Sequence, residues 1–98
     1  MVKELRNEEY LRTRVIDTGG FTRKVKWTGV RGAPDRLCAW PQHGRHAYVE
    51  VKEETQPWGL QEHQAREIGR MRLSGMSVWV LSNKAEIDLF INCQVHGK

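Results

Sequence analysis

Two acidic residues and a lysine stand at a spacing that suits phosphodiester chemistry. Asp35 follows the Gly-Ala-Pro segment 32–34, and Glu50 and Lys52 lie further along within an apolar, β-branched run. Because side chains alternate between the faces of a strand, Glu50 and Lys52 point the same way while the flanking valines point the other. A carboxylate and an ammonium projecting together from an interior strand are costly unless they are paired, hydrated or bound to metal. The pattern therefore predicts a functional site.

The chemistry of this set is that of a metal-dependent phosphodiesterase. Phosphodiester hydrolysis needs a divalent cation, an activated water and a positive group near the developing charge. Magnesium prefers carboxylate oxygens and keeps several waters, so two acids and one backbone carbonyl are sufficient protein ligands. We expect Asp35 and Glu50 to converge on one Mg²⁺, with the Val51 carbonyl as a third ligand and Lys52 orienting the attacking water or stabilising the transition state. The alternative is a turn cap at Asp35 and an edge-strand ion pair between Glu50 and Lys52.

A glutamine in the middle of an apolar helix face extends the candidate site. Gln64 falls on the inward face of a predicted helix, among residues spaced by three or four positions. The apolar members of that face are Leu60, Ile68 and Met71. A buried amide must find a polar partner, so we expect Gln64 to bond Lys52, a metal-bound water or a DNA phosphate. The alternative is a side chain that extends to the helix edge.

The first predicted helix offers a glutamate in the same kind of position. Its apolar stripe consists of Leu5, Leu11, Val15 and Ile16, and Glu8 lies near the middle of that stripe. Glu8 is therefore a candidate site residue, with Glu4 and Glu9 as competitors. An ion pair with Arg12, four residues further along the helix, is the structural alternative.

The elements that must position these residues follow from hydrophobic periodicity and from Gly and Pro. The predicted helices are 3–17 and 60–73; the predicted strands are 21–27, 36–40, 46–52 and 76–81; and 85–91 is a possible short terminal helix. Segment 29–34 is predicted to be a turn, and the connection 41–45 fits a hairpin. The order α-β-β-β-α-β describes one α/β domain over residues 1–98, with a single pair of layers.

Composition restricts the class of protein. The chain is 39% hydrophobic and 29% charged, which is typical of a soluble globular domain. No segment is long and apolar enough to cross a membrane, and the first residues lack a signal-peptide core, so the cytoplasm is the expected location. The two cysteines have no CxxC spacing, and the histidines 43, 46, 63 and 96 show no metal-ligand spacing. The net charge of +4 mildly favours a polyanionic partner.

Basic and aromatic residues near the candidate site could contact a nucleic acid. The basic residues around the strands and turns that lead into the site are Lys24, Lys26, Arg31, Arg36 and Arg45. They form either a solvated surface or a set of phosphate contacts. Trp58, in a polar loop, could stack on a base or could pack that loop against the domain.

The ordered set Asp35, Glu50-x-Lys52 and Gln64 resembles the PD-(D/E)xK nuclease superfamily. More closely, residues 4–91 are similar to the stand-alone virus-type replication-repair nuclease domain, VRR-NUC. The matching segments are Gly19-Gly20, the box 29–36, Val49 to Lys52, Leu60 to Gln64, and Gly75 before the apolar strand 78–81.

The resemblance implies a restriction-endonuclease-like fold similar to Holliday junction resolvases, and an endonuclease that uses Mg²⁺ (or Mn²⁺). It implies Asp35 and Glu50 as metal ligands, Lys52 as the catalytic lysine, and Gln64 as the helix glutamine, with Glu8 as the matching first-helix glutamate. It also implies branched DNA as the substrate, roles in DNA repair and recombination, and a bacterial or phage-infected cell.

A homodimer is a further expectation of the resemblance, since one small domain covers little of a branched junction. Trp40, Trp79 and Phe90 are candidates for the interface, although core packing is the simpler role for Trp79. Three other functions compete: a non-catalytic DNA-binding module, a small restriction-type nuclease, and a purely structural partner protein.

Overall fold

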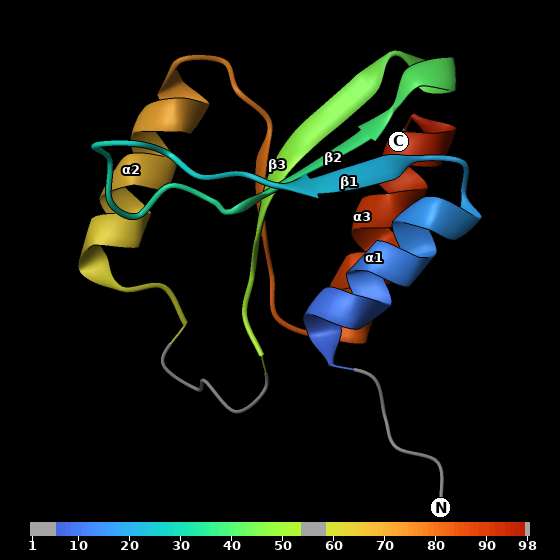
Figure 1. The fold of residues 1–98 in the computed structure, drawn as a ribbon, viewed down its shortest axis with the longest axis horizontal. Coiled ribbons are helices and arrows are strands. Elements are labelled where there is room, and N and C mark those ends of the chain that lie inside the picture. The colour runs from blue at the N-terminus through green and yellow to red at the C-terminus, as the bar shows by residue number, and fades with distance from the viewer. Residues whose placement is uncertain (1–5, 54–58, 98) are drawn as a thin grey trace, which may run out of the picture.

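Four strands and three α-helices make up the part of the chain that the computed structural model describes, residues 6–53 and 59–97 (Figure 1). In chain order they are α1 (Asn7–Asp17), β1 (Phe21–Lys24), β2 (Arg36–Trp40), the short 3₁₀ helix η1 (Pro41–His43), β3 (Arg45–Val51), α2 (Glu62–Leu73), β4 (Val78–Leu81) and α3 (Lys84–His96). The predicted α-β-β-β-α-β order is confirmed, and a third helix follows it.

The strands form one mixed sheet in the order β1-β2-β3-β4. β1 and β2 are antiparallel, as are β2 and β3, whereas β3 and β4 are parallel. The β2–β3 hairpin closes through η1 and Gly44, whose φ of 63° lies in the left-handed region that glycine adopts readily. Parallel neighbours cannot be joined by a tight turn, so the chain crosses from β3 to β4 through α2.

Helices cover both faces of the sheet, with α2 on one side and α1 and α3 on the other (Figure 1). β4 has apolar side chains on both of its faces: Val78 packs with α2, whereas Leu81 packs in the core beneath α1 and α3. β3 is also apolar on both faces, with Tyr48 on the α2 side and Val49 on the side of α1 and α3. A strand that is apolar on both faces must be covered on both faces, so the sheet has two helical layers rather than the single one predicted.

The larger core lies between the sheet and the α1–α3 pair. Trp40 and Phe90 are fully buried there, and their rings meet edge-on with centroids 5.7 Å apart. Trp79 is half-buried and makes a similar contact with Phe90 at 5.1 Å. Trp40 and Phe90 therefore belong to the core, and their suggested place at a dimer interface is wrong. Ile16, predicted to lie on the buried stripe of the first helix, is 51% exposed because it falls beyond the side that faces β2 and α3.

Several boundaries differ from the sequence prediction. β1 ends at Lys24 rather than at residue 27; the Val25 amide still donates to the Asp35 carbonyl in register with β2, and beyond it the chain leaves the sheet as a loop. α3 is much longer than the predicted 85–91, because it continues for five more residues and ends only at Gly97, whose φ of 73° is left-handed; its start is capped by the Asn83 side chain, which accepts from the Glu86 amide. α1 begins at Asn7, and residues 3–5 of its predicted span lie outside the described part of the chain.

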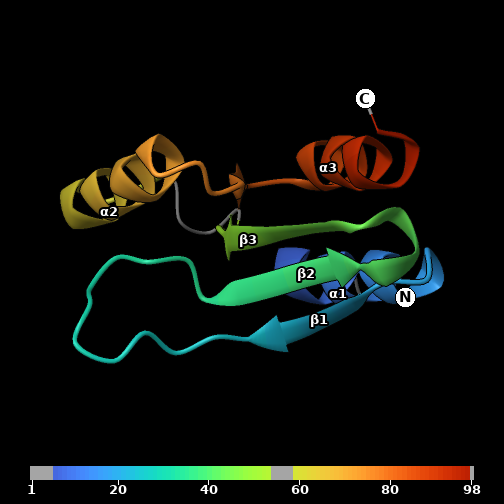
Figure 2. The ribbon, with the colours of Figure 1, turned by 90° about the horizontal axis from the view of Figure 1, so that it is seen from above.

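The loop between β1 and β2 extends beyond the strands toward α2 (Figures 1 and 2). The indole N–H of Trp27 donates to the Pro34 carbonyl at 2.7 Å, and its ring lies against Tyr48. At Gly32, φ is 86° and a Cβ would lie 2.6 Å from the backbone oxygen of His63, so only glycine fits there. This close approach holds the loop that leads to Asp35 against the start of α2.

No helix in the described ranges 6–53 and 59–97 has the length and apolar character needed to span a bilayer.

Candidate active site

Glu50, Lys52 and Gln64 form a hydrogen-bonded cluster where the end of β3 meets the start of α2. The Lys52 Nζ donates to Gln64 Oε1 at 2.8 Å, and the Gln64 Nε2 donates to Glu50 Oε2 at 3.2 Å. The Lys52 Nζ lies 3.7 Å from the same Glu50 oxygen. Glu50 is 9% exposed and Lys52 is 8% exposed, so both charges are buried and each is paired.

Lys52 lies one residue beyond the end of β3, which runs from Arg45 to Val51 instead of the predicted 46–52. Its backbone nevertheless continues the strand, because its amide donates to the Leu81 carbonyl of β4 at 2.8 Å. The period-two alternation is therefore kept through Lys52, and its side chain meets that of Glu50 as the sequence predicts.

Gln64 is positioned by the first turn of α2. Gln61 is the N-cap residue of that helix, and its backbone N–H donates to Gln64 Oε1 at 3.1 Å, which forms half of a capping box. The same oxygen accepts from Lys52, so one amide serves both the helix end and the buried lysine. The hydrogen bond predicted between Gln64 and Lys52 is present.

Asp35 immediately precedes β2 and lies next to the Glu50 carboxyl. Burial raises the pKa of Glu50, and the negative charge of Asp35 raises it further. Lys52 and a backbone hydrogen bond from Asp35 act in the opposite direction but do not offset these effects. An exposed carboxyl, that of Asp35, thus lies near the buried carboxyl of Glu50, which is an arrangement that a bound cation would stabilise.

Glu8 reaches this region through two basic residues that are distant in sequence. The Lys24 ammonium pairs with the Glu8 carboxylate and lies 3.5 Å from Asp35 Oδ2. Arg36 pairs with the same Glu8 oxygen at 3.0 Å. Burial acts to raise the pKa of Glu8, but the hydrogen bonds from Lys24 and Arg36 outweigh it, so the pKa lies below its usual value. Glu8 therefore pairs with Lys24 and Arg36, rather than with Arg12 as the ion-pair alternative proposes.

The competitors of Glu8 contribute less to the site region. Glu9 follows Glu8 in the first turn of α1 but is exposed, and Glu4 lies outside the described residues. Lys24 connects Glu8 to Asp35, so the geometry favours Glu8 among the three glutamates.

Within residues 6–53 and 59–97, no three His, Cys, Asp or Glu side chains converge closely enough to hold a metal ion. The predicted donor set is smaller, consisting of the carboxylates of Asp35 and Glu50 and the carbonyl of Val51, the last residue of β3. These donors are all oxygen atoms, which is the chemistry that Mg²⁺ prefers. The assignment of the three ligands remains a prediction.

Sequence reasoning missed two residues that fix the position of Lys52. Asn7 is 2% exposed, and its side-chain amide donates to the Lys52 carbonyl at 2.8 Å and to the Ser82 carbonyl at 2.7 Å. Glu53 accepts from the backbone amides of Asn7 at 2.8 Å and Glu8 at 3.2 Å, which places a carboxylate at the N-terminus of α1. The only sequence signal was an Asn near a helix start, because these contacts join segments far apart in the chain.

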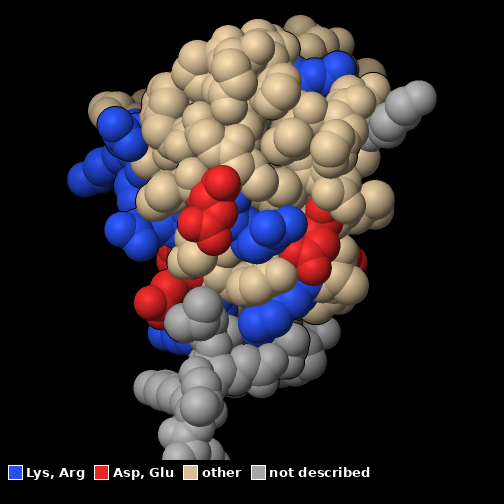
Figure 3. Space-filling model, turned by 90° about the vertical axis from the view of Figure 1, so that its right-hand side faces the viewer, with Lys and Arg blue, Asp and Glu red and all other residues tan. Residues whose placement is uncertain are grey.

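The predicted basic surface is dispersed in the structure. Arg36 is 7% exposed and donates to Glu8 and Thr22, so it supports the fold and is not available to follow a phosphate backbone. Arg45 lies at the opposite end of β3 and donates to the Cys93 carbonyl at 3.4 Å. On the side that Figure 3 shows, acidic and basic side chains are intermixed over the centre. Trp58, proposed to stack on a base, lies outside the described residues.

The chain is similar in fold and sequence to known proteins. A solved structure described as "VRR_NUC domain" superposes with a TM-score of 0.76 and is 34% identical, covering 87% of this chain and 89% of that chain. A curated relative named "Putative nuclease p44", from Acyrthosiphon pisum secondary endosymbiont phage 1, is 38% identical over an alignment of 66 residues that covers 64% of this chain and 70% of the relative. No family model matches the chain. The class that the fold and the site define is that of a small nuclease domain.

Within that class, the chain belongs to the VRR-NUC family. The resemblance drawn from the sequence is confirmed, and so is the α/β fold.

Proposed function

We propose that this chain is a metal-dependent DNA endonuclease of the PD-(D/E)xK type that hydrolyses phosphodiester bonds in branched DNA such as four-way junctions. The observation that carries the proposal is the cluster of Glu50, Lys52 and Gln64 with Asp35 at its border. A domain that only bound DNA would have no need of a buried carboxylate, a buried ammonium and an amide that joins them, since each is costly to bury.

Asp35 and Glu50 are the proposed ligands of Mg²⁺ (or Mn²⁺), with the Val51 carbonyl. The residues fit a hard cation, because both side-chain donors are carboxylates, and burial together with the nearby charge of Asp35 raises the pKa of Glu50. Bound there, the metal would neutralise phosphate charge and activate a water molecule. The Lys24 ammonium lies 3.5 Å from the Asp35 carboxylate, on which the metal would bind.

Lys52 is the proposed catalytic lysine. Its ammonium lies on the same side of the chain as the Glu50 carboxylate, where it can orient the attacking water or stabilise the charge that develops on the phosphate. Gln64 holds both groups through its two amide atoms, so it keeps the lysine pointing toward the proposed metal site. Glu8 contributes through Lys24, which it shares with Asp35.

We propose the preference for branched DNA and the homodimer because the chain resembles stand-alone VRR-NUC domains and because one small domain covers little of a junction. A two-fold dimer would present two active sites to the approximately two-fold arms of a four-way junction. Light scattering at the concentration used for cleavage tests the dimer. A monomeric mass together with full junction cleavage would rule it out.

The test is cleavage of matched four-way, flapped and linear duplex DNA with Mg²⁺, with Mn²⁺ and with excess chelator. We expect metal-dependent cutting of the branched substrates that is lost in Asp35→Asn and kept in Asp17→Asn, which removes an exposed carboxylate at the end of α1. Robust cleavage in chelator would disprove the metal site. DNA binding without any cleavage would support the non-catalytic module, and sequence-dependent cutting of linear duplex would support a restriction-type nuclease.

A further inference from the structure

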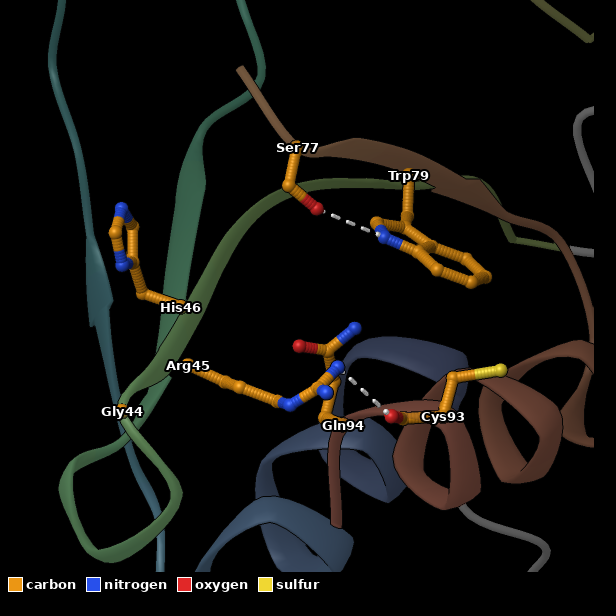
Figure 4. Close-up of a pocket in the computed structure, with 7 residues that line it drawn as sticks. All are labelled: Gly44, Arg45, His46, Ser77, Trp79, Cys93 and Gln94. Carbon is orange, nitrogen blue, oxygen red and sulfur yellow. Dashed lines mark hydrogen bonds between the residues drawn. The ribbon is translucent and has the colours of Figure 1, made fainter. Parts of the chain in front are cut away.

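A second candidate site lies at the end of β3 opposite to the catalytic cluster. A pocket of about 590 Å³ opens there between the start of β3, the segment before β4, and the last turns of α3 (Figure 4). Its lining includes Arg45, His46, Ser77, Trp79, Cys93 and Gln94. The volume lies within the range of small-molecule sites in proteins.

Gln94 is the unexplained group in this pocket. It is 6% exposed, yet its side chain makes no hydrogen bond to any other residue in the described part of the chain. Figure 4 shows its amide projecting from α3 into the space that Ser77 and Trp79 border. The amide atoms are open to this space, so a ligand with a complementary donor and acceptor could pair with both of them.

The other polar groups of the pocket are fixed in place. The Trp79 indole donates to the Ser77 hydroxyl at 3.2 Å and packs against Phe90. Arg45 is held by the carbonyl of Cys93. No acidic residue lines the pocket, and the His46 ring points away from it, so the guanidinium of Arg45 sets a positive charge (Figure 4).

We propose that this pocket binds a single nucleotide. An amide that presents both a donor and an acceptor matches the edge of a nucleobase, as it does in glutamine–adenine pairs. The Trp79 indole offers an aromatic surface on which a base can stack, and an arginine is well suited to hold a phosphate. The ligand is therefore planar, has a hydrogen-bonding edge, and carries an anionic group.

This site is separate from the proposed catalytic centre. Arg45 and Glu50 are five positions apart on β3, so their side chains leave opposite faces of the sheet roughly 17 Å apart along the strand. Nucleotide binding here does not depend on the metal, and it can be tested without cleavage. The nucleotide can come from solution or can be an unpaired residue of a DNA strand, since both carry the same base and phosphate.

The experiment is an NMR titration of the ¹⁵N-labelled full chain in excess chelator with deoxynucleoside 5′-monophosphates. We expect saturable shifts of the Gln94 side-chain amide and the Trp79 indole N–H, weaker binding of the unphosphorylated nucleoside, and weaker binding still of inorganic phosphate. Glu50→Gln should bind the nucleotide as the wild type does. Gln94→Met should weaken binding about tenfold, which corresponds to one lost hydrogen bond to the ligand.

Gln42→Leu is the matched control, since this exposed glutamine lies on η1 outside the pocket lining. A short single-stranded oligonucleotide that binds with higher affinity than the mononucleotide, at the same two signals, identifies a DNA strand as the source; equal or weaker binding identifies the free nucleotide. The proposal is overturned if the two wild-type signals do not move at millimolar nucleotide, or if Glu50→Gln abolishes their shifts. The wild-type titration tests nucleotide binding in this pocket even if Gln94→Met does not fold.

Discussion

Replacing Gln64 by leucine tests whether the polar cluster holds the structure together. From helix periodicity alone, a leucine between Leu60 and Ile68 would be expected to strengthen the apolar face of α2. The hydrogen bonds reverse this expectation, because Gln64 is the shared partner of Lys52 and Glu50 and also receives the Gln61 amide.

The size of the effect follows from these three contacts. Loss of the acceptor of the buried Lys52 ammonium should cost about 1.5–3 kcal/mol, as for other hydrogen bonds to charged groups. Loss of the capping contact to Gln61 should cost about 1 kcal/mol. The leucine regains on the order of 1 kcal/mol by burying apolar surface at this half-buried position. These terms give a net loss of about 1.5–3 kcal/mol before the contact with Glu50 is counted, which lowers the Tm of a domain this size by roughly 6–24 °C.

Urea unfolding followed by circular dichroism, in excess chelator, measures this loss. The matched control is Gln42→Leu, a surface substitution that should change the free energy of unfolding by no more than about 0.5 kcal/mol. If Gln64→Leu is as stable as the wild type, then Lys52 and Glu50 do not depend on Gln64, and the proposed role of the amide in holding them is refuted.

Three further predictions concern the charges around the site. Lys24→Met should tighten Mn²⁺ binding about threefold to tenfold, measured by calorimetry, because it removes the cation beside Asp35. The control Lys26→Met should leave the affinity for Mn²⁺ unchanged. Equal affinities in the two variants would show that Lys24 does not compete with the metal. Burial and the charge of Asp35 raise the pKa of Glu50 above 4.5, so the folded chain binds that proton more tightly than the unfolded chain and ionisation of Glu50 costs stability. In urea titrations with chelator, the stability of Glu50→Gln relative to wild type should therefore be greatest at about pH 8 and should decline toward about pH 4. A stability difference that does not change with pH would contradict the raised pKa of Glu50. Asn7→Ala should lower the free energy of unfolding by about 2–4 kcal/mol, because the carbonyls of Lys52 and Ser82 lose their donor, and an unchanged urea midpoint would show that α1 is held by its other contacts.

Strand alternation, helix periodicity and the positions of Gly and Pro predicted most of the helices and strands, because these elements depend on residues that are neighbours in the sequence. β2 is found at its predicted bounds, because alternation and the flanking prolines define a short strand completely. Gln64 was identifiable because a polar residue inside an apolar stripe must have a partner. The length of α3 was underestimated, because the prediction ended with the apolar run at residue 91, whereas the helix continues to His96 and ends at Gly97.

Contacts between distant segments were not predictable in the same way. Lys24 alternates as a strand residue should, but nothing in its neighbourhood indicates that its partners are Glu8 and Asp35. Asn7 binds carbonyls 45 and 75 residues away, and a backbone carbonyl has no residue type by which to recognise it. The identities of the candidate residues were therefore predictable, whereas the contacts that hold them in position were not.

The bonds of Asn7 also determine when the candidate site can form. One amide joins α1 to the end of β3 and, across 75 residues, to the end of β4, and Lys52 can be held only after both strands are paired. Contacts of such large sequence separation require closure of a long loop, so they form late in folding. A chain that is still being synthesised, or one that is only partly folded, therefore cannot hold the cluster in place. The geometry of the cluster arises only once the whole sheet has formed, so an incomplete chain lacks the arrangement that the proposed cleavage requires.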